Sequence, residues 1–200
     1  MEQATFTLRR AHVADRNRLR AMQALSMRAL ACEFYAPAEI EAFLTYVGTV
    51  DEHLLAEGTY HLIEVGGAVV ASGGWSQFRA NFAKSADPAA DMSVAKTRSV
   101  FVHPDWTRNG FATRLMRRAE AEAFGAGFNE MELNAMLSGV GFYATLGYRR
   151  IRDIAVSMPE GVVFRGVTMR KMLTQEVARA PASSGTVEHR LTGRRCGVAA

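Results

Sequence analysis

The alternation of apolar and polar residues along the chain predicts a mixture of strands and helices. Residues 6–9 alternate like a short strand, whereas apolar side chains recur near helical spacing over residues 15–31. A second helix is expected at residues 37–47, because Pro37 suits a first helical position and the apolar residues after it form one stripe. The chain therefore opens with a strand and two helices.

Two further strands and a long loop follow. Residues 60–65 and 68–75 are strand-forming runs joined by Gly66 and Gly67, and this link predicts a hairpin because both positions tolerate positive φ. Residues 77–96 are rich in Ala, Ser, Asp and Asn. A loop of this length is expected to be either a functional flap or a mobile insertion.

The second half of the chain again alternates strands with helices. Residues 98–103 are expected to form the fourth strand, with Pro104 and Asp105 in a turn after it. The later elements are expected to be a helix from Phe111 to about Gly125 and Gly127, a strand at 130–135, a helix at 140–146 that Gly147 can cap, and a hairpin of strands 151–158 and 162–171. This order is typical of an α/β fold.

The length of 200 residues is sufficient for one α/β domain with its own core. From residue 174 onward the sequence has almost no periodic apolar pattern, and Ala, Ser, Gly and Pro replace core residues. We therefore expect one domain at residues 1–173 and a disordered or weakly ordered tail at residues 174–200.

The charge of the chain argues against nucleic acid as a partner. The net charge is +4, and four arginines against two glutamates after Leu173 supply +2 of it, which leaves only +2 for the expected domain. No apolar run approaches the roughly 20 residues that cross a bilayer, so no membrane partner is expected. The N-terminus lacks an export signal and two cysteines are too few for a disulfide framework, which predicts a cytoplasmic protein. The sequence leaves open whether the chain is a monomer or a homodimer.

In the stretch HPDWTRNGFATRL, residues 103–115, the expected helix begins after the turn at Pro104 and Asp105, and the start of the helix itself contains no acidic residue. A helix N-terminus carries unpaired N–H groups and a partial positive charge, so it binds phosphate readily. No Asp or Glu lies between Thr107 and Ala119, and Gly110 allows an anion to approach the backbone. The alternative is an amphipathic helix that merely lacks acids in its first turns.

Two motifs together resemble the GNAT N-acetyltransferase superfamily. Residues 107–112, TRNGFA, match its acyl-CoA loop pattern Gln/Arg-x-x-Gly-x-Gly/Ala at Gly110 and Ala112, and residues 142–148, FYATLGY, match its later helix pattern fully. Thr107 departs from the usual Gln or Arg. A GGWS stretch at residues 73–76 resembles one bacterial subgroup of this superfamily.

The resemblance implies a single GNAT-like domain with a mixed central sheet of about seven strands, helices on both faces, and splayed fourth and fifth strands. It implies acetyl-CoA as co-substrate, with no metal. The pantetheine arm would lie beside strand four and the pyrophosphate at the helix start. The residues that it places at acetyl-CoA are Phe101, Val102, Arg108, Asn109, Gly110, Phe111, Ala112, Thr113, Asn134 and Ser138.

The resemblance also implies direct attack of an amine on the thioester, and it places the Tyr143 hydroxyl near the sulfur as the acid. We expect the acceptor amine to be that of a small molecule. The alternative for Tyr143 is a core aromatic. No general base is assigned, with His103, Glu132 and Glu33 as weak options and a turn-stabilising role favoured for His103. A second hypothesis is a non-catalytic acyl-CoA-binding or regulatory module on the same fold.

The acceptor side is the least determined part of the sequence. Glu33 and Tyr35, in the junction between the first two helices, could receive a cationic amine, although a solvated helix junction is the favoured interpretation. Trp75 follows two glycines at a strand end, a pattern that indicates close backbone approach beside an aromatic ring. The identity of the acceptor does not follow from these residues.

Overall fold

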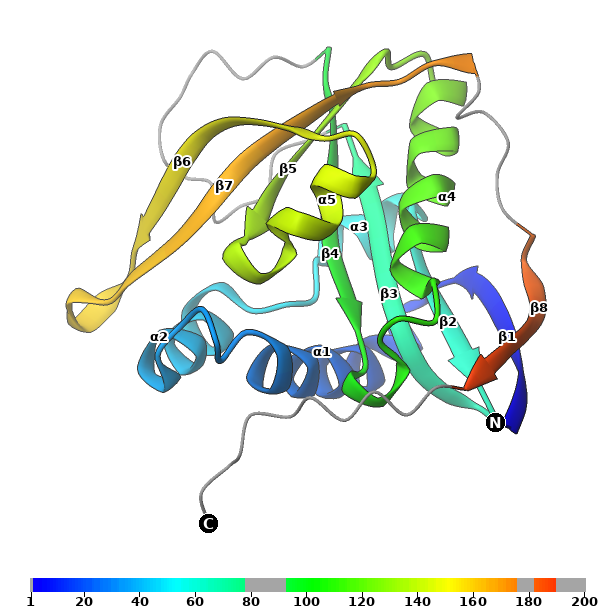
Figure 1. Ribbon diagram of the computed structural model, residues 1–200, viewed down its shortest axis with the longest axis horizontal. Coiled ribbons are helices and arrows are strands. Elements are labelled where there is room, and N and C mark those ends of the chain that lie inside the picture. Colours follow the sequence, from blue (N-terminus) through cyan, green and yellow to red (C-terminus); the bar gives the residue numbers. More distant parts are fainter. Residues whose placement is uncertain (1, 78–92, 176–181, 190–200) are drawn as a thin grey trace.

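The computed structural model describes residues 2–77, 93–175 and 182–189, and one sheet dominates this part of the chain (Figure 1). Its strands are β1 (Glu2–Arg10), β2 (Tyr60–Val65), β3 (Ala68–Ser76), β4 (Ala95–Val102), β5 (Glu130–Met136), β6 (Arg149–Ser157), β7 (Val163–Met172) and β8 (Ser184–His189). The α-helices are α1 (Arg16–Leu30), α2 (Pro37–Ala42), α3 (Glu52–Glu57), α4 (Phe111–Gly125) and α5 (Val140–Thr145).

The strands lie in the order β6-β7-β5-β4-β3-β2-β1-β8. β4 and β5 run parallel, whereas the other neighbouring strands are antiparallel, so the expected mixed α/β sheet is confirmed. The hairpin between β2 and β3 is also confirmed, with φ of 55° at Gly66 and 79° at Gly67. Gly147 follows α5 with φ of 89°, which satisfies the expected left-handed cap.

Strand β8 corrects one expectation from the sequence. Residues 184–189 fall in the tail that was expected to be disordered or weakly ordered, yet they form a strand that pairs with β1 from Thr7↔Ser184 to Glu2↔His189. The edge of β1 offers unpaired backbone groups, and hydrogen bonds to such an edge do not need the apolar periodicity that the sequence pattern measures. Residues 176–181 and 190–200 lie outside the described residues, and the division at residue 173 stays a prediction.

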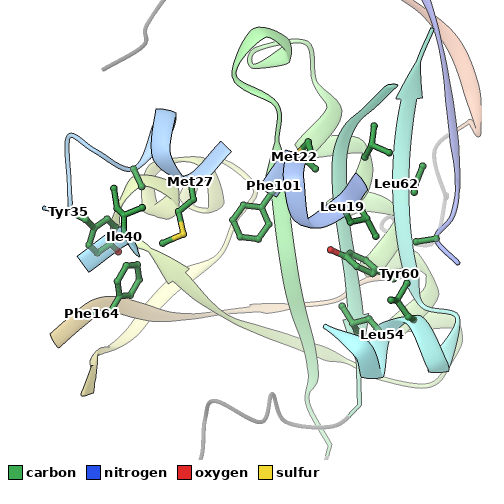
Figure 2. Close-up of a cluster of buried hydrophobic side chains, with 14 of the residues drawn as sticks. Leu19, Met22, Met27, Tyr35, Ile40, Leu54, Tyr60, Leu62, Phe101 and Phe164 are labelled. Carbon is green, nitrogen blue, oxygen red and sulfur yellow. The ribbon is translucent and has the colours of Figure 1, made fainter. Parts of the chain in front are cut away.

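Helices cover both faces of the sheet. Each strand contributes apolar side chains to both faces, because successive strand residues point in opposite directions. Leu62 on β2 joins a cluster with side chains of α1, α2 and α3 (Figure 2). Its neighbour Ile63 joins the cluster on the opposite face, where Phe111 and Leu115 of α4 are buried. Each such fully buried apolar side chain stabilises the fold by roughly 1.5–3 kcal/mol relative to exposure.

The structure differs from the expected elements at three places. β4 starts at Ala95, before the expected residue 98, and Ala95 is fully buried beside β5. Helix α3 was not expected, although Asp51 caps it by accepting a hydrogen bond from the His53 amide. The second helix is α-helical to Ala42 and continues as a π-helical turn, Phe43–Val47. Residues 78–92 of the expected loop lie outside the described residues.

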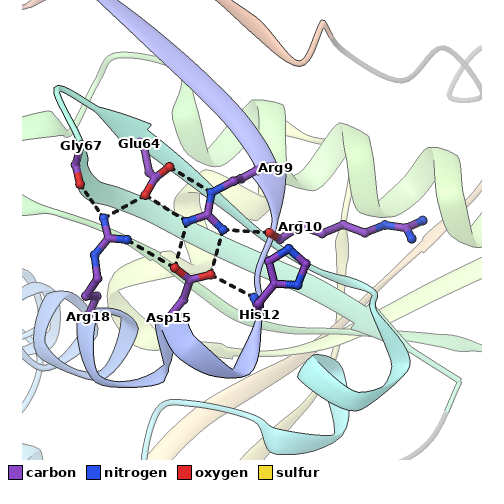
Figure 3. A network of polar contacts seen from close by, with 7 residues as sticks. All are labelled: Arg9, Arg10, His12, Asp15, Arg18, Glu64 and Gly67. Carbon is purple, nitrogen blue, oxygen red and sulfur yellow. Dashed lines mark hydrogen bonds and ion pairs between the residues drawn. The ribbon is translucent and has the colours of Figure 1, made fainter.

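A charged network joins the start of α1 to β1 and β2 (Figure 3). The Arg9 guanidinium donates to both Asp15 oxygens, each at 2.8 Å, and to Glu64 Oε2 at 2.9 Å. Arg18 donates to Glu64 Oε1 at 2.8 Å, and the His12 amide donates to Asp15. The hydrogen bonds from Arg9 lower the pKa of Asp15 to about 2, against the opposing effect of its burial. The ionised Asp15 therefore stabilises the folded state.

We expect Asp15→Asn to lower the free energy of unfolding by about 2 kcal/mol at neutral pH, since the pKa shift reflects stabilisation of the charged form. The folded pKa lies below the ordinary value of 3.8, so this stabilisation is present above that pH and is lost as the pH falls through about 2. Chemical denaturation of both proteins across this pH range measures the effect.

A suitable control is Glu41→Gln. Glu41 pairs with Arg28 at 2.7 Å, but both side chains are more than half exposed. Such a pair contributes about 0.2–1 kcal/mol. Equal losses in the two variants would show that the Asp15 network adds no special stability.

Candidate functional site

The sheet opens between β4 and β5. The two strands pair only at Ala95↔Met131 and Lys96↔Glu132 and then diverge, so the expected splay of the fourth and fifth strands is confirmed. A cavity of about 1310 Å³ occupies this region. Its wall is formed by the diverging strands together with residues of α1, the start of α4, α5 and β6. The cavity is large enough for an extended ligand.

A β-bulge in β4 accompanies the divergence. Ser72 on β3 faces Phe101 and Gly74 faces Arg98, so β4 contains one residue more than β3 between these pairs. Ser99, within the bulge, has φ of 55°. A non-glycine residue in this region costs on the order of 1–3 kcal/mol, and such strain occurs mainly where surrounding contacts fix it at a site of function. Ser99 and Val100 both line the cavity.

The start of α4 lies at the same cavity. Gly110 is the N-cap with φ of 78°, no side chain caps the helix, and its first turn contains no acid. The amides of Phe111, Ala112 and Thr113 are therefore available to a ligand, in the half of the helix end that carries partial positive charge. Arg108, with φ of 64°, also lines the cavity. The arrangement can bind a phosphate group.

Nine of the ten residues expected at acetyl-CoA line the cavity; the exception is Asn109. Phe101 and Phe111 are only 8% and 1% exposed as whole residues, and their side chains belong to the core clusters on the two faces of the sheet. Asn134 accepts a hydrogen bond from Thr168 Oγ1 at 2.9 Å, which orients its amide. The nine that line the cavity are Phe101, Val102, Arg108, Gly110, Phe111, Ala112, Thr113, Asn134 and Ser138.

Tyr143 on α5 also lines the cavity. Its ring lies against Gly139, where a Cβ atom would be 3.1 Å from Cε2, and it packs edge-on against Tyr148. Burial raises the pKa of the Tyr143 phenol above its ordinary value. The hydroxyl is therefore protonated at neutral pH and can donate a proton or a hydrogen bond.

None of the three weak candidates for a general base gains support. Glu132 lines the cavity, but Lys96 binds it at 2.8 Å and Arg170 at 2.8 Å. Burial raises the pKa of Glu132, and these two partners outweigh burial, so its pKa lies below the ordinary value. His103 Nδ1 accepts from the Asp105 amide, which confirms the turn role. Glu33 is exposed and is not part of the cavity wall.

Tyr35 and Trp75, which were expected near the acceptor, are not part of the cavity wall either. The Tyr35 hydroxyl donates to the Arg165 carbonyl and accepts from the Leu137 amide, both at 2.7 Å, and its ring stacks on Phe164. Trp75 donates to Glu122 at 3.2 Å and packs on Phe128. These contacts give both residues a structural role.

Sequence reasoning missed most of the wall opposite α4. This wall includes Met27, Leu30, Phe43 and Thr49, together with residues 152–157 of β6. The apolar stripe of α1 was visible in the sequence, but a stripe that faces a cavity has the same spacing as one that faces a core. The residues of this wall could therefore be identified only from the structure.

Within residues 2–77, 93–175 and 182–189, no group of three His, Cys, Asp or Glu side chains has the geometry of a metal site. In the same part of the chain, no helix is long and apolar enough to span a membrane. A cytoplasmic location and the choice between monomer and homodimer stay predictions.

Comparison with known proteins relates the chain to acetyltransferases. Residues 24–148 match the Acetyltransferase (GNAT) family. Among curated proteins, none matches the chain. A solved structure that it resembles is the GCN5-related N-acetyltransferase of Rhodopseudomonas palustris, with 22% identity, a TM-score of 0.66, and coverage of 86% of this chain and 99% of that one.

Two similar structures carry a bound cofactor. The PaiA N-acetyltransferase of Thermoplasma acidophilum, in complex with coenzyme A, has 14% identity, a TM-score of 0.62, and coverage of 84% and 98%. The phosphinothricin acetyltransferase of Sinorhizobium meliloti, in complex with acetyl-CoA, has 20% identity, a TM-score of 0.57, and coverage of 88% and 93%. At these identities the likeness shows a shared fold.

The start of α4 yields a prediction for coenzyme A, the ligand that the motif resemblance implies. Gly110→Asp should weaken its affinity at least about tenfold, because a carboxylate would occupy the anion-binding helix end. Gly110→Asn is the matched control, since Asn and Asp both tolerate positive φ and differ mainly in charge. Isothermal titration of each variant measures the affinity, and equal weakening would contradict a phosphate-binding role.

Proposed function

This chain belongs to the GNAT acetyltransferase family, and on that premise we propose that it transfers acetyl from acetyl-CoA to the amine of a small molecule. The observation that carries the proposal is the gap between β4 and β5, with an uncapped helix start at one end and a protonated tyrosine in its wall. We propose direct attack of the amine in a ternary complex, without a covalent enzyme intermediate.

The backbone of β4 supports the placement of the cofactor. Beyond Lys96, no described strand pairs with the β5 side of β4, so the backbone groups of Val102, which point away from β3, lack a strand partner there. The amide groups of pantetheine can supply the missing hydrogen bonds. With the pyrophosphate at Gly110 and the arm along β4, the thioester would lie inside the gap, within reach of Tyr143.

The chemistry assigned to these groups is simple. The amine nitrogen forms a bond to the thioester carbon, and the carbon–sulfur bond breaks. An N–H group of β4 stabilises the negative charge on the carbonyl oxygen, an effect worth on the order of 3 kcal/mol in other enzymes. Tyr143 donates its proton to the departing thiolate. We assign no protein base, and propose that the amine loses its proton to water.

The size of the acceptor is inferred from the cavity wall. Met27, Leu30 and Phe43 close the side opposite α4, which fits a compact amine with some apolar surface. The name of the phosphinothricin acetyltransferase among the similar structures states a small-molecule substrate. These observations support a small molecule and do not identify it.

Tyr143→Phe should lower kcat by about 10²–10⁴ while the acetyl-CoA dissociation constant changes little, because only the proton donor is removed. Tyr148→Phe is the matched control, since Tyr148 packs against Tyr143 but does not line the cavity. Steady-state kinetics and acetyl-CoA titration of both variants test the assignment. Unchanged turnover in Tyr143→Phe would remove this residue from the mechanism.

Release of free thiol from acetyl-CoA in the presence of a panel of small amines tests the activity itself. We expect acceptor-dependent release with at least one amine and mass-spectrometric detection of its N-acetyl product. Tight binding of acetyl-CoA with no release across the panel would instead support the non-catalytic acyl-CoA-binding module.

A further inference from the structure

Ser99, the residue with positive φ in β4, is held from two sides. Its own hydroxyl donates to the Thr49 carbonyl at 3.0 Å, and its carbonyl accepts from Ser72 Oγ at 3.3 Å. The first contact ties the bulge to the segment before α3, and the second ties it to β3. Backbone strain of this kind persists only where neighbouring groups fix it. These two contacts therefore hold the bulge in its observed shape.

Ser72 belongs to a buried polar relay that crosses from α1 to β4. The Gln23 amide on α1 donates to the Tyr60 hydroxyl and, at 2.9 Å, to Ser72 Oγ. The Tyr60 hydroxyl donates to Ser72 Oγ at 3.4 Å, and Ser72 then donates to the Ser99 carbonyl. Gln23, Tyr60 and Ser72 are all fully buried.

Buried hydrogen bonds of this kind add little net stability, because folding only exchanges hydrogen bonds with water for hydrogen bonds within the protein. The relay is therefore not explained by stability alone. Burial raises the pKa of Tyr60 to about 12, so its hydroxyl keeps its proton and can act as a donor. Gln23 and Tyr60 both donate to Ser72 Oγ, and Ser72 donates its own proton to the Ser99 carbonyl. The relay thus ends at one peptide group of the cavity wall.

The orientation of that peptide determines where its other end points. The Ser99 carbonyl and the Val100 N–H belong to one planar trans peptide, in which the two groups point in opposite directions. The carbonyl points to Ser72, in the protein interior, so the Val100 N–H points away from Ser72. Val100 lines the cavity between β4 and β5.

We propose that Gln23, Tyr60 and Ser72 are positioning residues that aim and polarise the Val100 N–H toward the thioester carbonyl. This inference rests on the proposed function, because it requires acetyl-CoA in the gap. Ser72 fixes the direction of the peptide through its carbonyl, and a hydrogen bond to that carbonyl also strengthens the N–H as a donor through cooperative polarisation. The three residues would act through Val100 without touching the substrate.

The kinetic test compares two buried serines on the same strand. Ser72→Ala should lower kcat about tenfold or more, part of the 10²–10³ that loss of a complete oxyanion donor costs, with the acetyl-CoA dissociation constant unchanged within about twofold. Ser76→Ala is the matched control, because Ser76 is equally buried and bonds Glu57 at 3.0 Å, away from the bulge. Ser72→Thr keeps the hydroxyl and should recover most of kcat. Equal loss of kcat in Ser72→Ala and Ser76→Ala would overturn the proposal.

A spectroscopic test needs no acceptor and so separates this inference from the activity. Acetyl-CoA labelled with ¹³C at the carbonyl should show a lower C=O stretching frequency when bound to the wild-type protein, since a hydrogen bond weakens that double bond. In Ser72→Ala the frequency should return toward the value of free acetyl-CoA, whereas Ser76→Ala should match the wild type.

The outcomes distinguish the two proposals. A wild-type shift that disappears only in Ser72→Ala supports the positioning role, even if no amine in the panel is acetylated. Bound acetyl-CoA with no shift, or with the same shift in Ser72→Ala, overturns the positioning role and leaves the proposed function intact. Failure of the wild-type protein to bind acetyl-CoA overturns both. Thermal unfolding of each variant checks that the folded state persists.

Discussion

The rest of the structure depends on the early separation of β4 from β5. Two parallel strands that stayed paired would satisfy each other's backbone groups and leave no space between them. Here the pairing stops after Lys96↔Glu132, and β5 continues its ladder with β7 while β4 continues with β3. The resulting gap sets the place of the cavity and leaves one edge of β4 without a strand partner, and the start of α4 lies at this cavity. The bulge at Ser99 bends β4 within this same stretch.

Two polar networks of the chain differ in charge and in burial. Arg9, Asp15, Arg18 and Glu64 form a network between the end of β1, β2 and the start of α1, where each ion has an opposite partner and the pairs join α1 to the strands. The relay through Gln23 carries no formal charge and lies deep between α1 and the sheet. The charged network holds α1 against β1 and β2. The uncharged relay instead fixes the direction of the peptide group between Ser99 and Val100.

Local patterns in the sequence were sufficient for most of the elements, with α3 and β8 as exceptions, and for the part of the cavity wall at α4 and α5. The acid-free helix start at Gly110 and the FYATLGY motif with Tyr143 are both read from a few adjacent residues, and the structure places both at the cavity. Ser99 and Gln23 could not be found in this way, because a bulge depends on register with β3 and a buried amide on α1 looks like any polar helix residue. Tyr35 and Trp75 do not line the cavity, and the sequence could not show this because it does not tell which face a side chain occupies. Strand β8 escaped notice because backbone pairing leaves almost no side-chain signature.

The pairing of β8 with β1 has a consequence for the behaviour of the protein in solution. β8 covers an edge that would otherwise present the open backbone groups of β1, and Gly185 allows close approach because a Cβ there would be 3.0 Å from the Phe6 ring. An uncovered strand of this length is a template for pairing with other chains. Strand β8 thus shields the β1 edge against self-association, at the end of the sheet opposite β6, and a chain shortened at residue 173 would lose this protection from aggregation.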